Sequence, residues 1–298
     1  MASYKVSICI PTFNTKLEIF KRSLNSALNQ DYKNLEIIVS ENFSKNLNIF
    51  NYVKNNKRIK FFRHTKPLKA VDHLEFIIKK ASGDYFMYLF DDDFISPNFV
   101  SSNINLLNNI NKKKRDEYFI TGKIIEFNKN KKIKHPKAQC NYHENTLYNY
   151  SSNTFLRISK YLNFPHDSIF FCMIPVKALK KINYLKANSI KPYKDQMTPN
   201  LMLPFLFNLL LNLKLLYNKN ATYYLVLHSR RKPKGLIRIL INYFFGFFRI
   251  YKLYSHFLKI LFYKKYYHYF LILFYFYIKN NIKYLKKTLK KIIFNNLY

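Results

Sequence analysis

Carboxylates are missing from the last third of the sequence. Asp195 is the last acidic residue, and residues 196–298 carry 18 Lys and Arg without one Asp or Glu. Any chemistry that depends on a carboxylate therefore lies at or before Asp195. The whole chain has 51 Lys and Arg against 16 Asp and Glu, a formal net charge of +35, and such an excess favours anionic partners such as nucleic acids or membrane surfaces.

Glycine, tryptophan and cysteine are also scarce. The chain has four glycines, none before Gly83, which argues against the Gly-rich phosphate loop of nucleotidyltransferases that act on sugar phosphates. Tryptophan is absent. The three cysteines, Cys9, Cys140 and Cys172, lack metal-ligand spacing, so we expect free thiols in a reducing compartment. Because no zinc spacing, RNP-like motif or DNA-binding helix is recognisable, we expect no nucleic-acid partner.

No hydrophobic run reaches the length of a membrane span. Within residues 232–298, the longest uncharged run, Tyr266–Ile278, has 13 residues, whereas a span needs about 20. From Ile278 to Ile292, apolar residues recur along one helix face with lysines on the other. Residues 232–298 therefore predict amphipathic helices that bind an anionic membrane surface, and a subunit interface or a true span is the alternative. Because the N-terminus shows no signal-peptide pattern, we expect the protein to be peripheral, at the cytoplasmic face of the plasma membrane.

The first 90 residues alternate between two periodicities. Four apolar runs of strand length are separated by segments with apolar residues at helical spacing. The runs are Val6–Ile10, Leu35–Val39, Ile59–Phe62 and Tyr85–Phe90. Alternating strands and helices predict right-handed crossovers and an α/β, Rossmann-like fold with a mainly parallel sheet.

Polar residues follow each of these four runs. They are Pro11–Asn14, Ser40–Asn42, Arg63–His64 and Asp91–Asp93. Because the carboxyl ends of parallel strands meet at one edge of a sheet, we expect these residues to line a single ligand crevice. Three adjacent carboxylates repel one another unless a cation neutralises them, and hard divalent cations take oxygen ligands. The pattern predicts a Mg²⁺ or Mn²⁺ site that also holds a phosphorylated ligand, with a solvated acidic turn as the alternative.

Five stretches within about the first 100 residues carry a family resemblance. They are Ser7–Asn14, Leu24–Asn34, Glu36–Asn42, Ala81–Tyr85 and Leu89–Pro97. In these stretches the sequence resembles the family 2 inverting glycosyltransferases of GT-A fold. The resemblance implies a nucleotide-sugar-binding half at 1–100 and an acceptor-binding and catalytic-base half at 101–231. The amphipathic helical tail at 232–298 is an addition to this fold.

The resemblance implies a nucleotide pocket at the first two strand ends. Pro11, Thr12 and Asn14 would line the pocket, and Glu41 would accept a hydrogen bond from a uracil-like ring N–H. The alternative for Glu41 is a carboxylate that is favoured by the positive end of a helix dipole.

The acidic cluster takes the remaining donor-site roles in the resemblance. Asp91 would face the ribose, Asp92 would ligate the metal ion, and Asp93 is the third carboxylate of the metal site. Phe90 stands where many relatives carry an acidic residue.

Inversion at a sugar carbon needs a general base, which takes the proton of the attacking hydroxyl. The family's base lies before a helix roughly a hundred positions after the acidic motif, and the matching residue here is Asp195. Asp167 is the second candidate, and a helix cap is the alternative role for Asp195. The basic residues within His228–Arg231 would neutralise the leaving diphosphate, or form a plain basic linker.

These observations together predict an inverting, metal-dependent glycosyltransferase. We expect a UDP-sugar donor and a glycan or lipid-linked acceptor in the synthesis of a bacterial surface polysaccharide or lipooligosaccharide. A protein that binds anionic surfaces or nucleic acids without catalysis, and a degenerate glycosyltransferase scaffold, are the alternatives.

Overall fold

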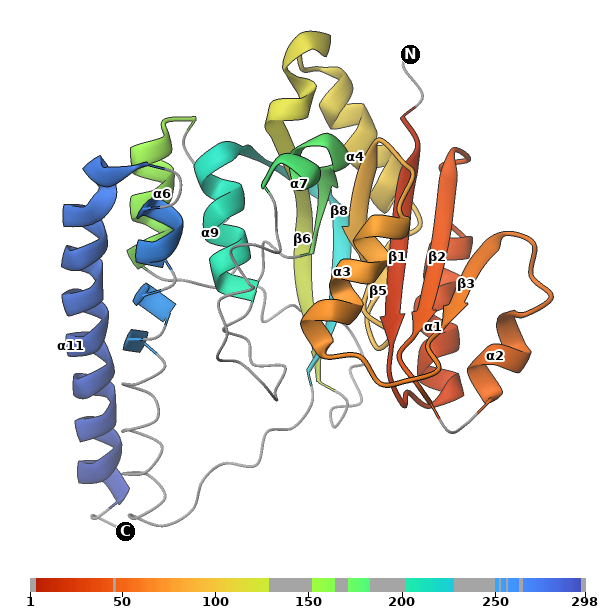
Figure 1. Ribbon diagram of the computed structural model, residues 1–298, viewed down its shortest axis with the longest axis horizontal. Helices are drawn as coiled ribbons and strands as arrows, with labels where there is room; N and C mark the ends of the chain where they lie inside the picture. The colour runs from red at the N-terminus through yellow and green to blue at the C-terminus, as the bar shows by residue number, and fades with distance from the viewer. Residues whose placement is uncertain are drawn as a thin grey trace. The chain divides into compact units, whose positions relative to one another are not determined.

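The fold comprises two compact units, each described here by itself. The structure is a computed structural model that describes residues 4–44, 47–128, 152–163, 171–182, 202–227, 250–251, 253–255, 257–262 and 265–295 (Figure 1). Unit 1 comprises Met1–Tyr150, Ser168–Met197 and Asn212–His228, and unit 2 comprises Ser151–Asp167, Thr198–Leu211 and Ser229–Tyr298.

Unit 1 is built on one eight-stranded sheet with the order β3-β2-β1-β4-β7-β6-β8-β5. Four strand pairs are parallel, namely β1 with β2 and β4, β2 with β3, and β6 with β8. The strands are β1 (Val6–Thr12), β2 (Leu35–Glu41), β3 (Ile59–Arg63), β4 (Tyr85–Tyr88), β5 (Phe94–Ile95), β6 (Tyr118–Asn128), β7 (Cys172–Pro175) and β8 (Lys214–Leu227). The predicted α/β fold with a mainly parallel sheet is therefore confirmed.

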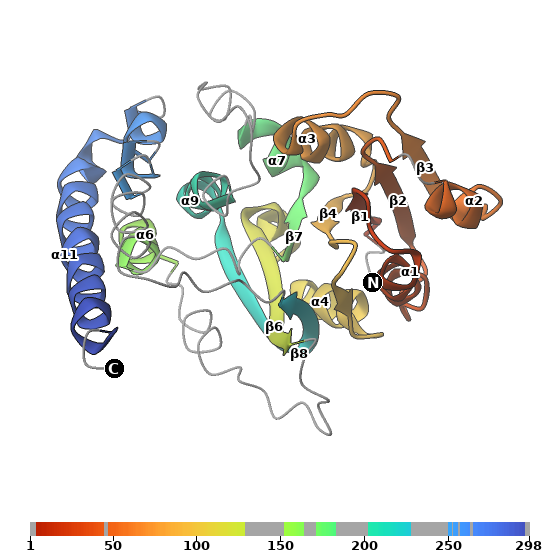
Figure 2. The ribbon, with the colours of Figure 1, turned by 90° about the horizontal axis from the view of Figure 1, so that it is seen from below.

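Helices cover both faces of this sheet. Figure 2 shows α3 (Ala70–Lys80) and α7 (Val176–Ile182) on one face, and α1 (Leu17–Leu28) and α4 (Phe99–Asn108) on the face toward which the sheet curls. The short α2 (Asn48–Val53) and the 3-10 helix η1 (Lys112–Glu117) complete the described helices of this unit. All seven residues of β1 are buried, as expected for a parallel strand covered on both sides.

Two features of the sheet were not evident from the sequence. The two-residue strand β5 directly follows the acidic cluster and pairs antiparallel with β8. β8 is long, with 14 residues from Lys214 to Leu227, and it pairs in parallel with β6. The β6–β8 pairing is interrupted by a register shift between Gly122 and Lys123. A Cβ at Gly122 would lie 2.5 Å from the carbonyl oxygen of Ala221, so the shifted strands leave room only for glycine.

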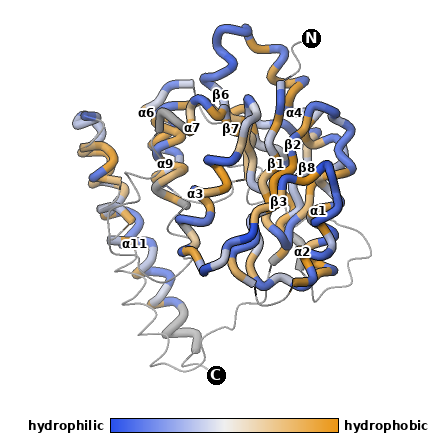
Figure 3. The backbone as a smooth tube through the Cα atoms, turned by 45° about the vertical axis from the view of Figure 1, so that its right-hand side comes forward, coloured by the Kyte–Doolittle hydropathy of each residue, from blue (hydrophilic) through white to orange (hydrophobic). Residues whose placement is uncertain are grey.

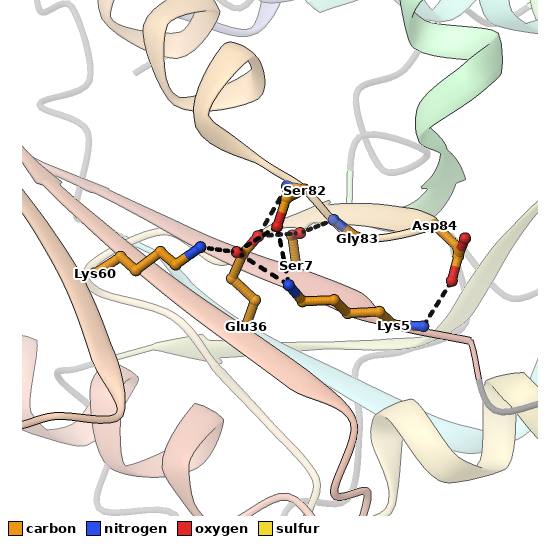
Figure 4. Close-up of polar contacts among 7 residues, drawn as sticks. All are labelled: Lys5, Ser7, Glu36, Lys60, Ser82, Gly83 and Asp84. Atoms are coloured by element: carbon orange, nitrogen blue, oxygen red, sulfur yellow. Dashed lines mark hydrogen bonds and ion pairs between the residues drawn. The ribbon is translucent and has the colours of Figure 1, made fainter.

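A buried carboxylate joins the strands at the edge of the sheet opposite the acidic cluster. Glu36 Oε1 accepts hydrogen bonds from Ser7 Oγ at 2.7 Å and from the Ser82 backbone N–H at 2.9 Å, and Oε2 accepts one from Ser82 Oγ at 2.6 Å (Figure 4). Lys60 also pairs with Oε2, and Lys5 Nζ lies 3.4 Å away. Glu36 therefore connects β1, β2, β3 and the turn before β4.

The same cluster requires the glycine of the predicted Ala81–Tyr85 motif. The backbone N–H of Gly83 donates to Ser7 Oγ at 2.9 Å. A Cβ at Gly83 would approach Lys5 O and Ser7 Oγ to 2.7 Å each, inside van der Waals contact. The motif is thus explained by close backbone packing, since the turn passes directly over β1.

We predict that Glu36→Gln destabilises the protein and removes an acid-dependent part of its stability. Burial acts to raise the pKa of Glu36, but hydrogen bonds from Lys60, Ser82 and Ser7 lower it to about 2 from an ordinary 4.5. The folded state therefore gains stability above pH 4.5 that is lost as the pH falls toward 2, about 3 kcal/mol in full. Urea unfolding of parent and variant between pH 2 and pH 7 measures this difference, and parallel pH profiles would contradict the prediction.

Unit 2 is helical. It contains α6 (Thr154–Asn163), most of α9 (Met202–Asn212), helical residues within 250–262, the 3-10 helix η4 (Tyr267–Tyr269) and α11 (Phe270–Asn295). Tyr161 OH donates to Leu203 O at 2.9 Å, and Arg157 Nε donates to Leu210 O at 2.7 Å. These bonds join α6 to α9 through carbonyl groups.

The predicted C-terminal helix is present as α11. Along this helix Figure 3 shows hydrophobic residues in the first turns and alternating hydrophobic and hydrophilic residues afterwards. Within the described ranges, no helix combines the length and the hydrophobicity needed to cross a bilayer. Cys9 and Cys172 are buried free thiols, and Cys140 lies outside the described residues.

Candidate active site

The first three strand ends lie at the same level of the sheet. Thr12 pairs with Glu41 across β1 and β2, and Glu41 pairs with Arg63 across β2 and β3. The ladder continues past the strands, because Asn42 N donates to Thr12 O at 2.9 Å and the N–H of His64 donates to Glu41 O at 3.0 Å. The polar strand ends seen in the sequence therefore meet at one edge.

The two carboxylate oxygens of Glu41 differ in their hydrogen-bond partners among the described residues. Oε2 accepts a hydrogen bond from Arg63 Nε at 3.1 Å, and Arg63 in turn donates to Ser44 O at 2.7 Å. Oε1 is buried and accepts no hydrogen bond from the described residues. Burial raises the pKa of Glu41, and Arg63 acts against that shift. A buried oxygen without a donor is costly unless a ligand supplies one.

Two histidines surround the strand end next to Glu41. Nε2 of His73 lies 2.9 Å from Ser40 Oγ and 3.0 Å from Ser40 O, and Nε2 of His64 lies 3.1 Å from the same hydroxyl. Burial lowers the pKa of His73 to about 4, and it also lowers that of His64. Both rings are therefore neutral at pH 7, so Arg63 provides the positive charge beside Glu41.

Asp91 is held against the end of β1. Its Oδ2 accepts hydrogen bonds from Thr15 Oγ1 and, at 3.3 Å, from the backbone N–H of Phe13. Burial raises the pKa of Asp91, and the hydroxyls of Thr15 and Thr12 act in the opposite direction. The adjacent Phe13 side chain is 55% exposed, which leaves an open aromatic ring beside the carboxylate.

Side chains of α1 fix the backbone of the acidic cluster. Arg22 Nη2 donates to Asp92 O at 2.7 Å, and Ser23 Oγ donates to Phe90 O at 2.9 Å. The Arg22 guanidinium also lies 4.9 Å from the centre of the Phe94 ring. Asp92 itself is half-buried. The direction in which this loop presents its carboxylates is therefore set by α1.

Asp93 differs from its two neighbours because it faces β8. Its Oδ1 accepts from Val226 N at 2.8 Å and its Oδ2 accepts from Tyr223 OH at 2.9 Å, while Tyr223 OH lies 3.3 Å from the N–H of Phe90. Only 1% of Asp93 is exposed. Burial, and then the charge of Asp92, raise its pKa to about 8. Asp93 therefore joins the acidic loop to β8, and its role as a metal ligand stays a prediction.

The described carboxylates can bind a divalent cation only together with oxygen atoms of a bound ligand. No group of three or more His, Cys, Asp or Glu side chains in the described part of the chain could hold a metal ion by itself. Asp92 and Asp91 lie at the strand end, and Asp93 is engaged by β8. Mg²⁺ commonly takes one or two protein carboxylates and completes its shell with phosphate oxygens and water. Asp92, with Asp91 nearby, fits that arrangement.

The remaining predicted residues divide into two groups. Pro11 is buried at the end of β1, and Asn14 is exposed with a φ of 53°, so the chain turns sharply beside Asp91. Asp195, Asp167 and His228–Arg231 lie outside the described residues.

Sequence reasoning missed the residues that orient the acidic loop. They are Thr15, Arg22, Ser23 and Tyr223. Ser23 has a signal in the sequence, since Ser23, Ser26 and Gln30 recur at intervals of three and four along the first predicted helix. Tyr223 had none, because it reaches the loop only through the pairing of β5 with β8.

The sequence that forms this fold matches a known family. The profile of "Glycosyl transferase family 2" matches residues 7–182, more than half of the chain. The chain belongs to glycosyl transferase family 2.

Characterised and solved relatives cover parts of the chain. It is 33% identical over 93 residues, 30% of each protein, to "GalNAc(5)-diNAcBac-PP-undecaprenol beta-1,3-glucosyltransferase" of Campylobacter jejuni. An uncharacterised glycosyltransferase of Rickettsia bellii is 36% identical over 110 residues, 36% of this chain and 16% of that protein. Matches to the curated relatives span less than half of the length of those proteins.

Two solved structures share the fold at low sequence identity. S. aureus TarS 1-349, also solved in complex with UDP, has a TM-score of 0.54 and 15% identity, with 85% of this chain and 65% of that chain covered. GalNAc-T7 with UDP, GalNAc and Mn²⁺ has a TM-score of 0.53 and 13% identity, with 76% and 44% covered. These structures support the GT-A fold.

Proposed function

We propose that this protein is a metal-dependent, inverting glycosyltransferase that moves a sugar from a UDP-sugar to a glycan or lipid-linked acceptor. One observation carries the proposal. At the end of β2, the buried Oε1 of Glu41 accepts no hydrogen bond from the described residues. Asp91 and Asp92 follow β4, which runs parallel to β1 and β2, so they lie at the same edge of the sheet. A UDP-sugar donor requires an acceptor for the N–H of its base, a carboxylate for its ribose, and a carboxylate for the metal ion on its diphosphate.

Each donor-site residue has a defined task in this proposal. Glu41 Oε1 accepts the ring N–H of uracil, which satisfies the oxygen that no described donor reaches. Asp91, oriented by Thr15 and Phe13, accepts from a ribose hydroxyl. Pro11, Thr12 and Asn14 shape the pocket wall at the end of β1. The UDP complexes of TarS and GalNAc-T7 agree with this choice of nucleotide.

Asp92 would hold a divalent cation at the diphosphate end of the donor. Mn²⁺ or Mg²⁺, when bound, would stabilise the negative charge that develops on the leaving diphosphate. Arg22 keeps the Asp92 backbone in place, so the carboxylate points to one position during the reaction. The basic residues within His228–Arg231 add positive charge for the same leaving group.

Asp195 is the general base of the proposed reaction. It removes the proton of the acceptor hydroxyl while that oxygen forms a bond to the anomeric carbon. The bond between this carbon and the diphosphate oxygen breaks on the opposite side, which inverts the configuration. Asp167 is the second candidate for this role.

The acceptor and the location are inferred together. The Campylobacter jejuni relative is named for an undecaprenol-linked acceptor, and the tail of this chain is basic and amphipathic. We propose that the protein extends a lipid-linked glycan in bacterial surface polysaccharide or lipooligosaccharide synthesis. It would do so as a peripheral protein at the cytoplasmic, anionic face of the plasma membrane.

A panel of nucleotide sugars tests the donor. UDP and UDP-sugars are expected to raise the unfolding temperature, and more so with Mn²⁺, because a ligand that binds only the folded state stabilises it, by about 2.7 kcal/mol at a hundredfold excess over Kd. GDP- and CMP-sugars serve as matched controls and should have little effect. Stabilisation by RNA without any response to UDP would contradict the proposal. UDP binding without sugar transfer to any glycan would indicate a scaffold.

A further inference from the structure

Helix α11 has two apolar faces, and the other described residues of unit 2 pack against one of them. On the inner face, Leu273 and Phe276 are 4% and 7% exposed, and Asn280 Nδ2 donates to Leu162 O at 2.7 Å and lies 2.6 Å from Tyr254 OH. These contacts join α11 to α6 and to the helical residues near 254. The inner face therefore completes the core of unit 2.

The second apolar face forms what is here named the outer stripe. Its members recur at intervals of four, three, four, three and four residues, so they lie along one side of the helix. They are Leu271, Tyr275, Ile278, Ile282, Leu285 and Leu289, each between 42% and 84% exposed. At 1.5 Å per residue the outer stripe is about 27 Å long. Inner-face positions such as 273, 276 and 280 point the opposite way, since they are half a turn away.

Charge borders the outer stripe on one side only. Lys279, Lys283, Lys286 and Lys290 also recur at intervals of four and three, about a quarter turn from the stripe. The other border carries Tyr277, Asn281 and Tyr284, without charge. No acidic residue occurs anywhere in residues 196–298. A helix with an apolar face, aromatic residues and a lysine row suits the boundary between lipid headgroups and acyl chains.

We propose that α11 lies flat in an anionic membrane surface with the outer stripe inserted and the lysine row on the headgroup phosphates. This rests on the membrane association proposed above and assigns it to one helix face. A second copy of the chain fits the stripe less well, because a paired α11 would bring further lysines and no carboxylate to the bordering positions. Lipid phosphates provide the opposite charge at about 1 kcal/mol per lysine.

The absence of tryptophan from the chain allows a direct test. Ile282→Trp places a fluorophore on the outer stripe, and Lys287→Trp places one nearly half a turn away on the same exposed helix segment. Full-length protein is mixed with vesicles of equal parts phosphatidylglycerol and phosphatidylcholine. Ile282→Trp fluorescence should shift to the blue and be quenched by brominated lipid, while Lys287→Trp should change little. Equal responses of the two variants, or none, would overturn the assignment.

A second set of variants distinguishes membrane binding by the outer stripe from nonspecific adsorption through other exposed apolar residues. Ile278→Ser/Ile282→Ser/Leu285→Ser should reduce vesicle flotation at least tenfold. The matched control Leu47→Ser/Tyr52→Ser/Leu156→Ser changes three residues that are exposed to a similar extent, 41% to 56%, and should float like the parent. Thermal unfolding confirms that both triple variants fold, and UDP binding is measured independently. A parent protein that does not bind UDP would refute the proposed function but not the membrane binding of the outer stripe.

Self-association gives the opposing outcome. Sedimentation velocity without lipid should show the parent and the stripe variant with the same mass. A parent dimer that the stripe substitutions dissociate, together with no vesicle binding, would make the stripe a subunit interface and overturn the proposal.

Discussion

Asp92→Asn is expected to abolish the part of UDP binding that depends on Mn²⁺ while leaving the fold intact. A neutral amide is a much weaker ligand for a hard cation than a carboxylate. The backbone around residue 92 is held by Arg22 through a carbonyl group, which this substitution keeps. Titration calorimetry with UDP, with and without Mn²⁺, should show at least a tenfold loss of affinity in the presence of the metal and little change in its absence.

Asp93→Asn is the matched control for Asp92→Asn. Asp93 accepts from Val226 N and Tyr223 OH, so Asp93→Asn keeps the size of the side chain and one of its two acceptor oxygens while it removes the carboxylate. If Asp93 only joins the acidic loop to β8, Asp93→Asn retains metal-dependent UDP binding. Parent-like binding by Asp92→Asn would show that the metal ligand is assigned wrongly, and loss of binding in a well-folded Asp93→Asn variant would make Asp93 a ligand.

Asp195→Asn is expected to retain donor binding and lose sugar transfer by roughly 10² or more, the usual scale for a general base. Asp195 is the last carboxylate of the chain, so the base for the acceptor hydroxyl has no later candidate. The measurement is transfer from a UDP-sugar, with UDP affinity determined in parallel. Asp167→Asn is the control and should stay within a few-fold of the parent. The opposite ranking of the two variants would move the role of base to Asp167.

The geometry of the acidic loop suggests that its carboxylates are oriented before the donor arrives. Arg22, Ser23, Thr15 and Tyr223 contact this loop from α1, from the end of β1 and from β8. Such pre-organisation lowers the cost of placing charge around a diphosphate. It also explains how one short acidic motif contains residues in different environments, since Asp93 is buried and its pKa is raised while Asp92 stays half-buried.

Periodicity in the sequence was sufficient for the first half of the sheet. The runs at Val6–Ile10 and Leu35–Val39 predicted β1 and β2, because a strand covered on both faces must be apolar throughout. Polar residues after such runs predicted a shared edge, and the register of Thr12 with Glu41 shows it. Local pattern and topology agree here, since the first two crossovers connect neighbouring strands and the third passes over β2 and β1 to reach β4.

Longer-range pairing was not readable from the sequence. β5 has two residues, too few for any periodicity, and it exists because β8 pairs with it after more than a hundred intervening residues. Asp93 therefore looked like a third equivalent carboxylate in the sequence. Its hydrogen bonds to Tyr223 and Val226, and the burial that raises its pKa, depend on that pairing.

The sequence by itself determined the fold class, the edge of the sheet that carries the polar strand ends, and the amphipathic character of the C-terminal helix. These properties follow from periodicity and charge, which act over a few residues. Only the tertiary structure decided that one Glu41 oxygen accepts no hydrogen bond from the described residues, that Asp93 turns toward β8, and that α11 buries one apolar face and exposes the other. Burial and hydrogen-bond partners decide these properties, and both come from residues that are distant in the chain.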